Sequence, residues 1–223
     1  MRLALVVLVA TALSYPLGLL LGGGVVLPVL NTAAAYAAMV VLLRRGDRRA
    51  AVRLMLAWAS ALALCATTTF ALWPSDPGPM VINGPAYRAE MFHWIRTGEG
   101  AEGDPARFLP QHVLHLAAFV AVSLATASAA AMTGGAALMN YMAFYVASLA
   151  RAGMAAGAVA RLGWQPWAIC RVAAFVVLGV VLAEPLLSRL ARYPHPGLRA
   201  ARPWLIAAAA GIAADWTLKA LLA

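Results

Sequence analysis

Long apolar runs constrain the fold of this chain more than any other feature of its sequence. Seven runs of about 20 residues follow one another, and they cover residues 3–21, 24–43, 52–73, 110–132, 135–151, 167–187 and 203–222. About 20 apolar residues in a helix cross the hydrocarbon core of a bilayer, which is about 30 Å thick. Charged residues make up only 11% of the chain, too few to cover a soluble globule. We therefore predict an all-α fold, a polytopic membrane helix bundle of six to seven transmembrane helices that forms a single transmembrane domain over residues 1–223.

The run at 135–151 is the shortest of the seven, and two interpretations of it remain open. It either crosses the membrane or forms a re-entrant or interfacial helix. Gly134 lies directly before this run, and Gly135 is its first residue. Adjacent glycines predict a tight turn between this run and the preceding one, residues 110–132. This segment decides between six and seven crossings.

The arginines predict the orientation of the bundle. Loop 44–53 holds five arginines against Asp47, and segment 188–202 holds four arginines and no acid. Such loops remain on the cytoplasmic side, which places the amino terminus inside and the carboxyl terminus outside. The acidic segment 74–109, between the third and fourth runs, is then an external loop. Because the arginines flank apolar runs, the net charge of +9 predicts no nucleic-acid partner. The near absence of lysine and the alanine-rich interior favour a bacterial gene and the inner (plasma) membrane.

The predicted external loop contains one short helix. The sequence "AYRAEMFHWIR" sets apolar Met91, Phe92, Trp94 and Ile95 among polar residues, as in an amphipathic helix. Tryptophan is typical of the membrane–water interface. We therefore expect an ordered periplasmic loop that carries a short interfacial helix.

Histidines gather in and just after this loop, because residues 87–116 hold three of the four in the chain. Glu90 and His93 are three residues apart, as are His112 and His115, so each pair shares a helical face. Three imidazoles and a carboxylate suit zinc. The spacing predicts a metal site of Glu90, His93, His112 and His115, in which Glu90 and His93 are also the catalytic candidates and the metal activates water. Interfacial packing or helix capping is the alternative role of the same residues.

Polar residues inside the apolar runs form a second group of candidates, because ionisable groups in membrane spans are costly and tend to be functional. The group comprises Asn140, Arg171, Asp215 and Lys219. Asp215 and Lys219 are four residues apart, a spacing that favours an ion pair within one helix; alternatively they face the bundle and meet Arg171 or the histidines. We expect Glu184 to pair with Arg189 near the end of its run, and Asn140 to bond between helices.

Three functions are compatible with these features. The chain contains no phosphate-binding loop, dinucleotide fingerprint or serine nucleophile elbow. The first function is that of a membrane-embedded metal-dependent enzyme with an outward-facing Glu/His cluster. The second is a small solute or proton transporter or channel component. The third is a non-catalytic subunit of a larger membrane complex, and the possible partners are then that complex, a second copy of the chain and the lipid bilayer. The sequence leaves open whether the protein is an enzyme.

Overall fold

A computed structural model describes residues 2–192 and 197–222. Over these residues the chain is helical and contains no strand, which confirms the all-α prediction. The elements are α1 (Arg2–Leu20), α2 (Val26–Arg44), α3 (Arg48–Leu72), the 3-10 turn η1 (Gly78–Met80), α4 (Gly84–Thr97), α5 (Pro105–Thr126), α6 (Ala129–Arg151), α7 (Ala156–Gly163), α8 (Pro166–Ala191) and α9 (Gly197–Leu222).

Six of these helices are long and apolar enough to cross a membrane: α1, α2, α3, α5, α8 and residues 199–222 of α9. This makes the chain a multi-pass membrane protein. The shortest predicted run corresponds to α6, a continuous helix of 23 residues that is not one of the six. Helix α6 packs inside the bundle, against α2, α3, α4, α5 and α7. At 1.5 Å per residue it is roughly 34 Å long, which is sufficient for a crossing.

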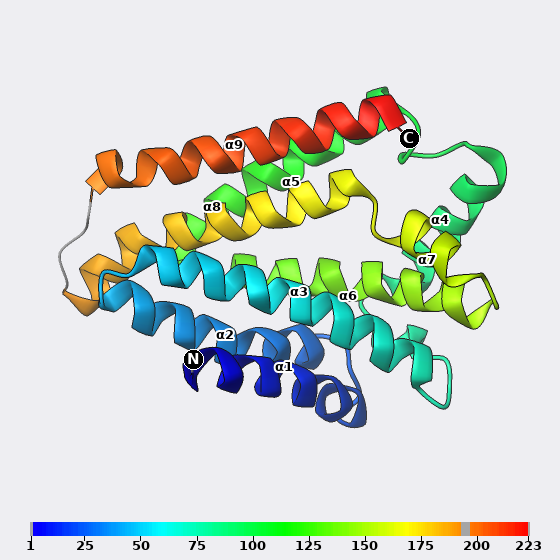
Figure 1. Ribbon diagram of the computed structural model, residues 1–223, viewed down its shortest axis with the longest axis horizontal. Helices are drawn as coiled ribbons and strands as arrows, with labels where there is room; N and C mark the ends of the chain where they lie inside the picture. The colour runs from blue at the N-terminus through cyan, green and yellow to red at the C-terminus, as the bar shows by residue number, and fades with distance from the viewer. Residues whose placement is uncertain (1, 193–196, 223) are drawn as a thin grey trace.

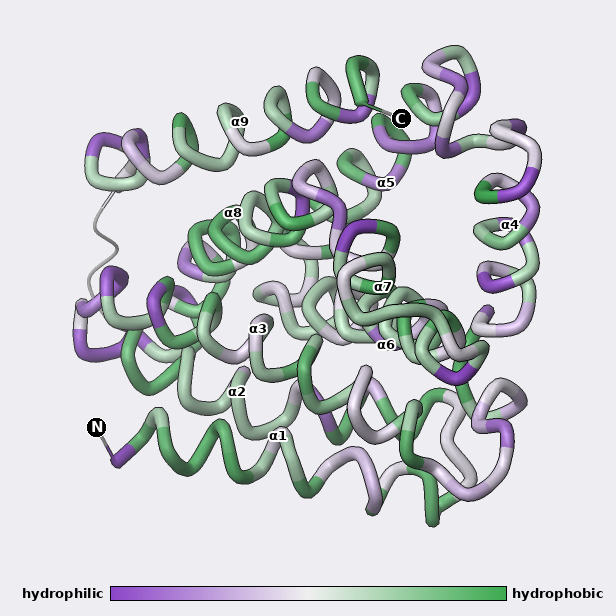
Figure 2. The backbone as a smooth tube through the Cα atoms, turned by 45° about the vertical axis from the view of Figure 1, so that its right-hand side comes forward, coloured by the Kyte–Doolittle hydropathy of each residue, from purple (hydrophilic) through white to green (hydrophobic). Residues whose placement is uncertain are grey.

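The long helices run back and forth between two ends of the bundle (Figure 1). The α2–α3 turn, the end of α8 and the start of α9 lie at one end, here named the basic end; residues 193–196 lie outside the described part of the chain. The other end, named the histidine end, carries α4, α7 and the segments that flank α4. Figure 2 shows hydrophilic segments at both ends and on α4, with largely hydrophobic helices between them. The predicted grouping of basic loops at one end agrees with this arrangement, and the side of the membrane that each end faces remains a prediction.

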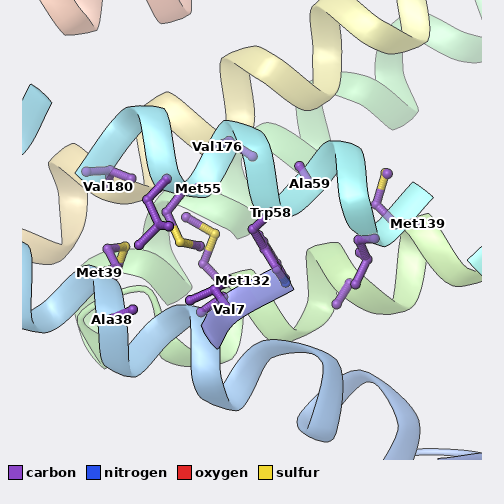
Figure 3. Packing of buried hydrophobic residues seen from close by; sticks show 14 of the residues in the cluster. Val7, Ala38, Met39, Met55, Trp58, Ala59, Met132, Met139, Val176 and Val180 are labelled. Atoms are coloured by element: carbon purple, nitrogen blue, oxygen red, sulfur yellow. The ribbon is translucent and has the colours of Figure 1, made fainter. Parts of the chain in front are cut away.

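The core lies between α1, α2, α3, α6 and α8. Met39, Met55 and Met132 meet there beside Trp58, and Val7 of α1 closes the group (Figure 3). These side chains are at most 3% exposed. Methionine is flexible and fills irregular gaps, which suits a junction of five helices.

A buried hydrogen-bond network links the first three helices to α6. The Asn140 Nδ2 atom of α6 donates to Asn31 Oδ1 at 2.9 Å, and Asn31 Nδ2 donates to Ser14 Oγ at 2.6 Å. The Tyr15 hydroxyl donates to Asn140 Oδ1 at 2.8 Å, and the Trp58 indole donates to the Asn31 carbonyl at 3.0 Å. The predicted role of Asn140 in bonding between helices is therefore confirmed.

We expect Tyr15→Phe to lower the free energy of unfolding by about 1 kcal/mol, because interhelical hydrogen bonds in membranes contribute about that much. The ring remains in place, and the hydroxyl's bonds to Asn140 Oδ1 at 2.8 Å and to the Leu62 carbonyl at 3.2 Å are lost. Thermal unfolding in detergent measures the change. The control is Tyr141→Phe, whose hydroxyl makes no hydrogen bond within the described part of the chain; equal losses in both variants would contradict the assignment.

The turn between α5 and α6 differs from the prediction. It falls at Ala127 and Ser128, both with positive φ, whereas Gly134 and Gly135 lie inside α6. Ser128 is held by its side chain, which donates to the Gly179 carbonyl of α8 at 2.7 Å. That hydrogen bond to α8 offsets the strain of a serine backbone in the left-handed conformation. The turn therefore falls at Ala127 and Ser128, and not at the glycines, which favour turns by their local preference.

Helix α4 matches the predicted loop helix, and its apolar face is covered by protein. Met91 is 1% exposed and packs with Tyr145, Val146 and Leu149 of α6. Tyr87 of the same helix packs against Tyr145 edge to face, with ring centroids 6.0 Å apart. Burial raises the pKa of the Tyr87 hydroxyl well above its usual value, so this group stays neutral.

Arg151, at the end of α6, binds the carbonyl end of α3. Its Nη1 atom donates to the carbonyls of Phe70, Trp73 and Ser75 at 3.3, 2.9 and 3.2 Å. Carbonyl groups in the last turn of a helix lack partners within it. This arginine therefore caps α3 at the histidine end, which explains an arginine on the acidic side of the bundle.

Candidate functional site

Charged and imidazole side chains from three helices and one loop meet near the histidine end. This group, named the Asp215 cluster, comprises Glu102, His112, His115, Arg171, Asp215 and Lys219. At its centre the Arg171 Nε atom of α8 donates to both carboxylate oxygens of Asp215 on α9, at 3.2 and 3.1 Å. Asp215 is 1% exposed and lies seven residues before the end of α9 at Leu222, roughly 10 Å along the helix axis. An acid is thus buried within a candidate membrane span.

His112 of α5 approaches the same carboxylate without bonding to it. Its Nδ1 atom lies 3.5 Å from Asp215 Oδ2, and this atom has no hydrogen-bond partner although the side chain is only 8% exposed. Phe108 packs beside the imidazole, with ring centroids 5.3 Å apart. A buried polar atom without a partner is rare in proteins, which marks this nitrogen as the unusual atom of the cluster.

A cavity of about 20 Å³ lies against these groups, lined by His112, His115, Leu116, Arg171, Phe175, Ile212, Asp215 and Trp216. Such a volume accommodates about one water molecule. His115 lies one turn after His112 and is exposed, so it connects the cavity with the surface of the bundle.

The second ion pair of the cluster lies one turn further along α9. The Lys219 ammonium binds Glu102 Oε2 at 2.9 Å and lies 4.5 Å from the centre of the Phe108 ring. Lys219 is 2% exposed. Because Glu102 belongs to the segment between α4 and α5, this pair fastens that segment to α9. Two cations and two carboxylates balance, so the cluster is neutral when both imidazoles are neutral.

An aromatic pair closes the cluster toward the basic end. Phe119 lies one turn after His115 on α5, and Phe175 lies one turn after Arg171 on α8. Their rings pack edge to face with centroids 4.8 Å apart. The cluster is therefore separated from the basic end by apolar side chains.

Five predicted residues come together here: His112, His115, Arg171, Asp215 and Lys219. The predicted alternative, in which the charges of the last span face the bundle and meet Arg171 and the histidines, is the observed arrangement. The predicted intrahelical pair of Asp215 with Lys219 is wrong, because partners from α8 and the α4–α5 segment reach each charge directly.

Glu90 and His93 lie elsewhere, exposed on α4. In the part of the chain that the structure describes, no three His, Cys, Asp or Glu side chains are grouped so as to hold a metal ion. Zinc binding by Glu90, His93, His112 and His115 remains a prediction from the sequence. Sequence reasoning missed Glu102, and the only available signal was that the chain's single lysine, inside an apolar run, requires an acid.

No family model, curated protein or solved structure matches this chain.

Proposed function

We propose that this protein is a small proton-translocating membrane protein, a transporter or channel component, and that the Asp215 cluster is its proton-transfer site. The observation that carries the proposal is the buried His112 Nδ1 atom, which lacks a hydrogen bond and lies 3.5 Å from the Asp215 carboxylate. Ionisable residues in membrane spans are typical of proton pathways.

The charges around His112 suit transient protonation. Arg171 and Lys219 are each matched by a carboxylate, so the cluster is neutral when the imidazoles are neutral. A proton that arrives on Nδ1 is stabilised by the neighbouring Asp215 carboxylate. Histidine is the side chain whose unperturbed charge change falls between pH 5 and 8, and it often serves as a proton shuttle.

Access and closure follow from the same geometry. Exposed His115 and a cavity for about one water molecule connect His112 to the outside of the bundle. Toward the basic end, the packed rings of Phe119 and Phe175 close the path from the cluster. A complete crossing therefore requires this aromatic pair to separate, as expected of a gated pathway.

We expect His112→Gln to lower proton flux about 100-fold, since a positioned proton-transfer group contributes at least that factor to rates. The purified protein is reconstituted into liposomes with a pH-sensitive dye inside, and a potassium diffusion potential drives proton entry. Glutamine keeps a similar length and polarity, so the fold is expected to survive.

The matched control is His93→Gln, an exposed histidine of α4 outside the cluster, which is expected to retain wild-type flux. Thermal unfolding of both variants checks that folding is unchanged. Wild-type flux no greater than that of empty liposomes, or equal flux in His112→Gln and wild type, would overturn the proposal.

A further inference from the structure

A hollow of about 460 Å³ lies on α9 near the basic end, lined by Arg199, Arg202, Leu205, Ile206 and Ala209. Spacings of three and four residues place Arg199, Arg202, Ile206 and Ala209 on one side of the helix. All four are exposed, so the hollow opens to the outside of the bundle. It lies within the candidate span 199–222 and therefore faces lipid.

Its two arginines are unpaired among the residues that the structure describes. Within the described residues, neither Arg199 nor Arg202 forms a hydrogen bond or an ion pair. Two acids lie at this end, and both are engaged: Asp47 caps α3 by accepting from the Ala50 amide at 2.9 Å, and Glu184 binds Arg48. The positive charge at the mouth of the hollow is thus uncompensated.

Polarity changes in one direction along the hollow. The arginines come first, and the apolar residues follow deeper in the span; Ala209 lies roughly 10 Å beyond Arg202 along the axis. Figure 2 shows the same order on α9, where hydrophilic residues at the basic end give way to hydrophobic ones. A phospholipid has this order too, with phosphate at the membrane surface and acyl chains below it.

We propose that this hollow binds one anionic phospholipid. The guanidinium groups of Arg199 and Arg202 hold the phosphate, for which arginine has matching bidentate geometry. One acyl chain lies along Leu205, Ile206 and Ala209. Basic pockets at the ends of membrane helices recognise anionic headgroups in this way, and the occupant is a lipid because the hollow opens into the bilayer.

The test counts lipids that remain bound to the protein in native mass spectrometry, after detergent exchange with phosphatidylglycerol or with phosphatidylcholine. We expect wild type to retain one phosphatidylglycerol in preference to phosphatidylcholine. Arg199→Gln/Arg202→Gln is expected to weaken that binding roughly 30-fold, the combined effect of two basic residues at an anionic membrane surface. Ala209→Trp is expected to prevent it as well, because the indole occupies the apolar part of the hollow where the acyl chain lies, while the charge is unchanged.

The matched control is Arg44→Gln/Arg45→Gln, which removes two exposed arginines from the same end and is expected to keep wild-type binding. Equal loss in both arginine pairs would show general attraction to the charged end and overturn the proposal. Unchanged binding in Ala209→Trp would also overturn it. Addition of inorganic phosphate distinguishes the lipid from a free anion: displacement of phosphatidylglycerol by millimolar phosphate contradicts a lipid site that depends on its acyl chain.

Discussion

Replacement of Arg48 by methionine is expected to lower the free energy of unfolding by about 3–5 kcal/mol, the usual cost of breaking a buried ion pair by removing one partner. The Arg48 guanidinium of α3 binds both carboxylate oxygens of Glu184 on α8, at 2.7 and 2.5 Å, and also the Ala200 carbonyl of α9. Glu184 is 3% exposed. The variant leaves this carboxylate in the protein interior without a counter-charge. Chemical or thermal unfolding in detergent measures the loss.

Two further variants isolate the ion pair from other effects. Arg49→Met removes an exposed arginine next in sequence, and we expect it to stay within about 0.5 kcal/mol of wild type. Arg48→Met/Glu184→Met removes both charges and is expected to recover most of the stability, since a buried pair replaced by apolar residues is often neutral. If Arg48→Met is no less stable than Arg49→Met, the pair contributes nothing to the fold.

The partner of Glu184 illustrates what sequence reasoning could not reach. We expected Arg189, five residues away on the same helix. The actual partner is 136 residues distant, on a helix that packs beside α8. Periodicity and hydropathy are local properties of a sequence and predict that α3 and α8 exist. Which two helices pack together is decided by the whole bundle, and ion pairs between helices depend on that packing.

The first residues of two helices were also predicted wrongly, although the sequence carries local signals for them. The third and fourth spans were predicted to start at residues 52 and 110, where the apolar runs begin, but α3 starts at Arg48 and α5 at Pro105. Asp47 and Asp104 cap these helices with their side chains, which accept from the amides of Ala50 and Ala106. An aspartate before a helix, and a proline at its first position, are start signals. Hydropathy alone does not detect these start signals, because the first turn of a capped helix can consist of polar residues.

The sequence identified most residues of the Asp215 cluster, but it did not predict which of them lie together. Each buried charge stood out because membrane spans rarely contain one. The histidine pair of α5 was recognised by its spacing, but Glu90 and His93 were expected to join it. Helix α4 instead packs through Met91 against α6, and Glu90 and His93 remain exposed. The place of Glu102 could not be foreseen, since acids in a polar loop are ordinary and its partner is 117 residues away.

The central acid of the cluster allows the sharpest test of the proposed function. We expect Asp215→Asn to abolish proton flux in liposomes, a loss of about 100-fold or more, because asparagine cannot accept the proton that His112 releases. It is also expected to lower the free energy of unfolding by about 2 kcal/mol. That value lies below the cost for a fully buried pair because Arg171, whose side chain is 27% exposed, can reach toward water.

A second variant separates these two effects. Asp215→Asn/Arg171→Gln removes the acid together with its main counter-charge, so no buried charge is left unmatched between them. We expect its stability to return to within about 1 kcal/mol of wild type, while proton flux remains absent. If flux recovered together with stability, Asp215 would serve only to hold α8 and α9 together. A folded double variant without flux, beside His93→Gln with normal flux, would instead identify Asp215 and His112 as the pair between which the proton moves.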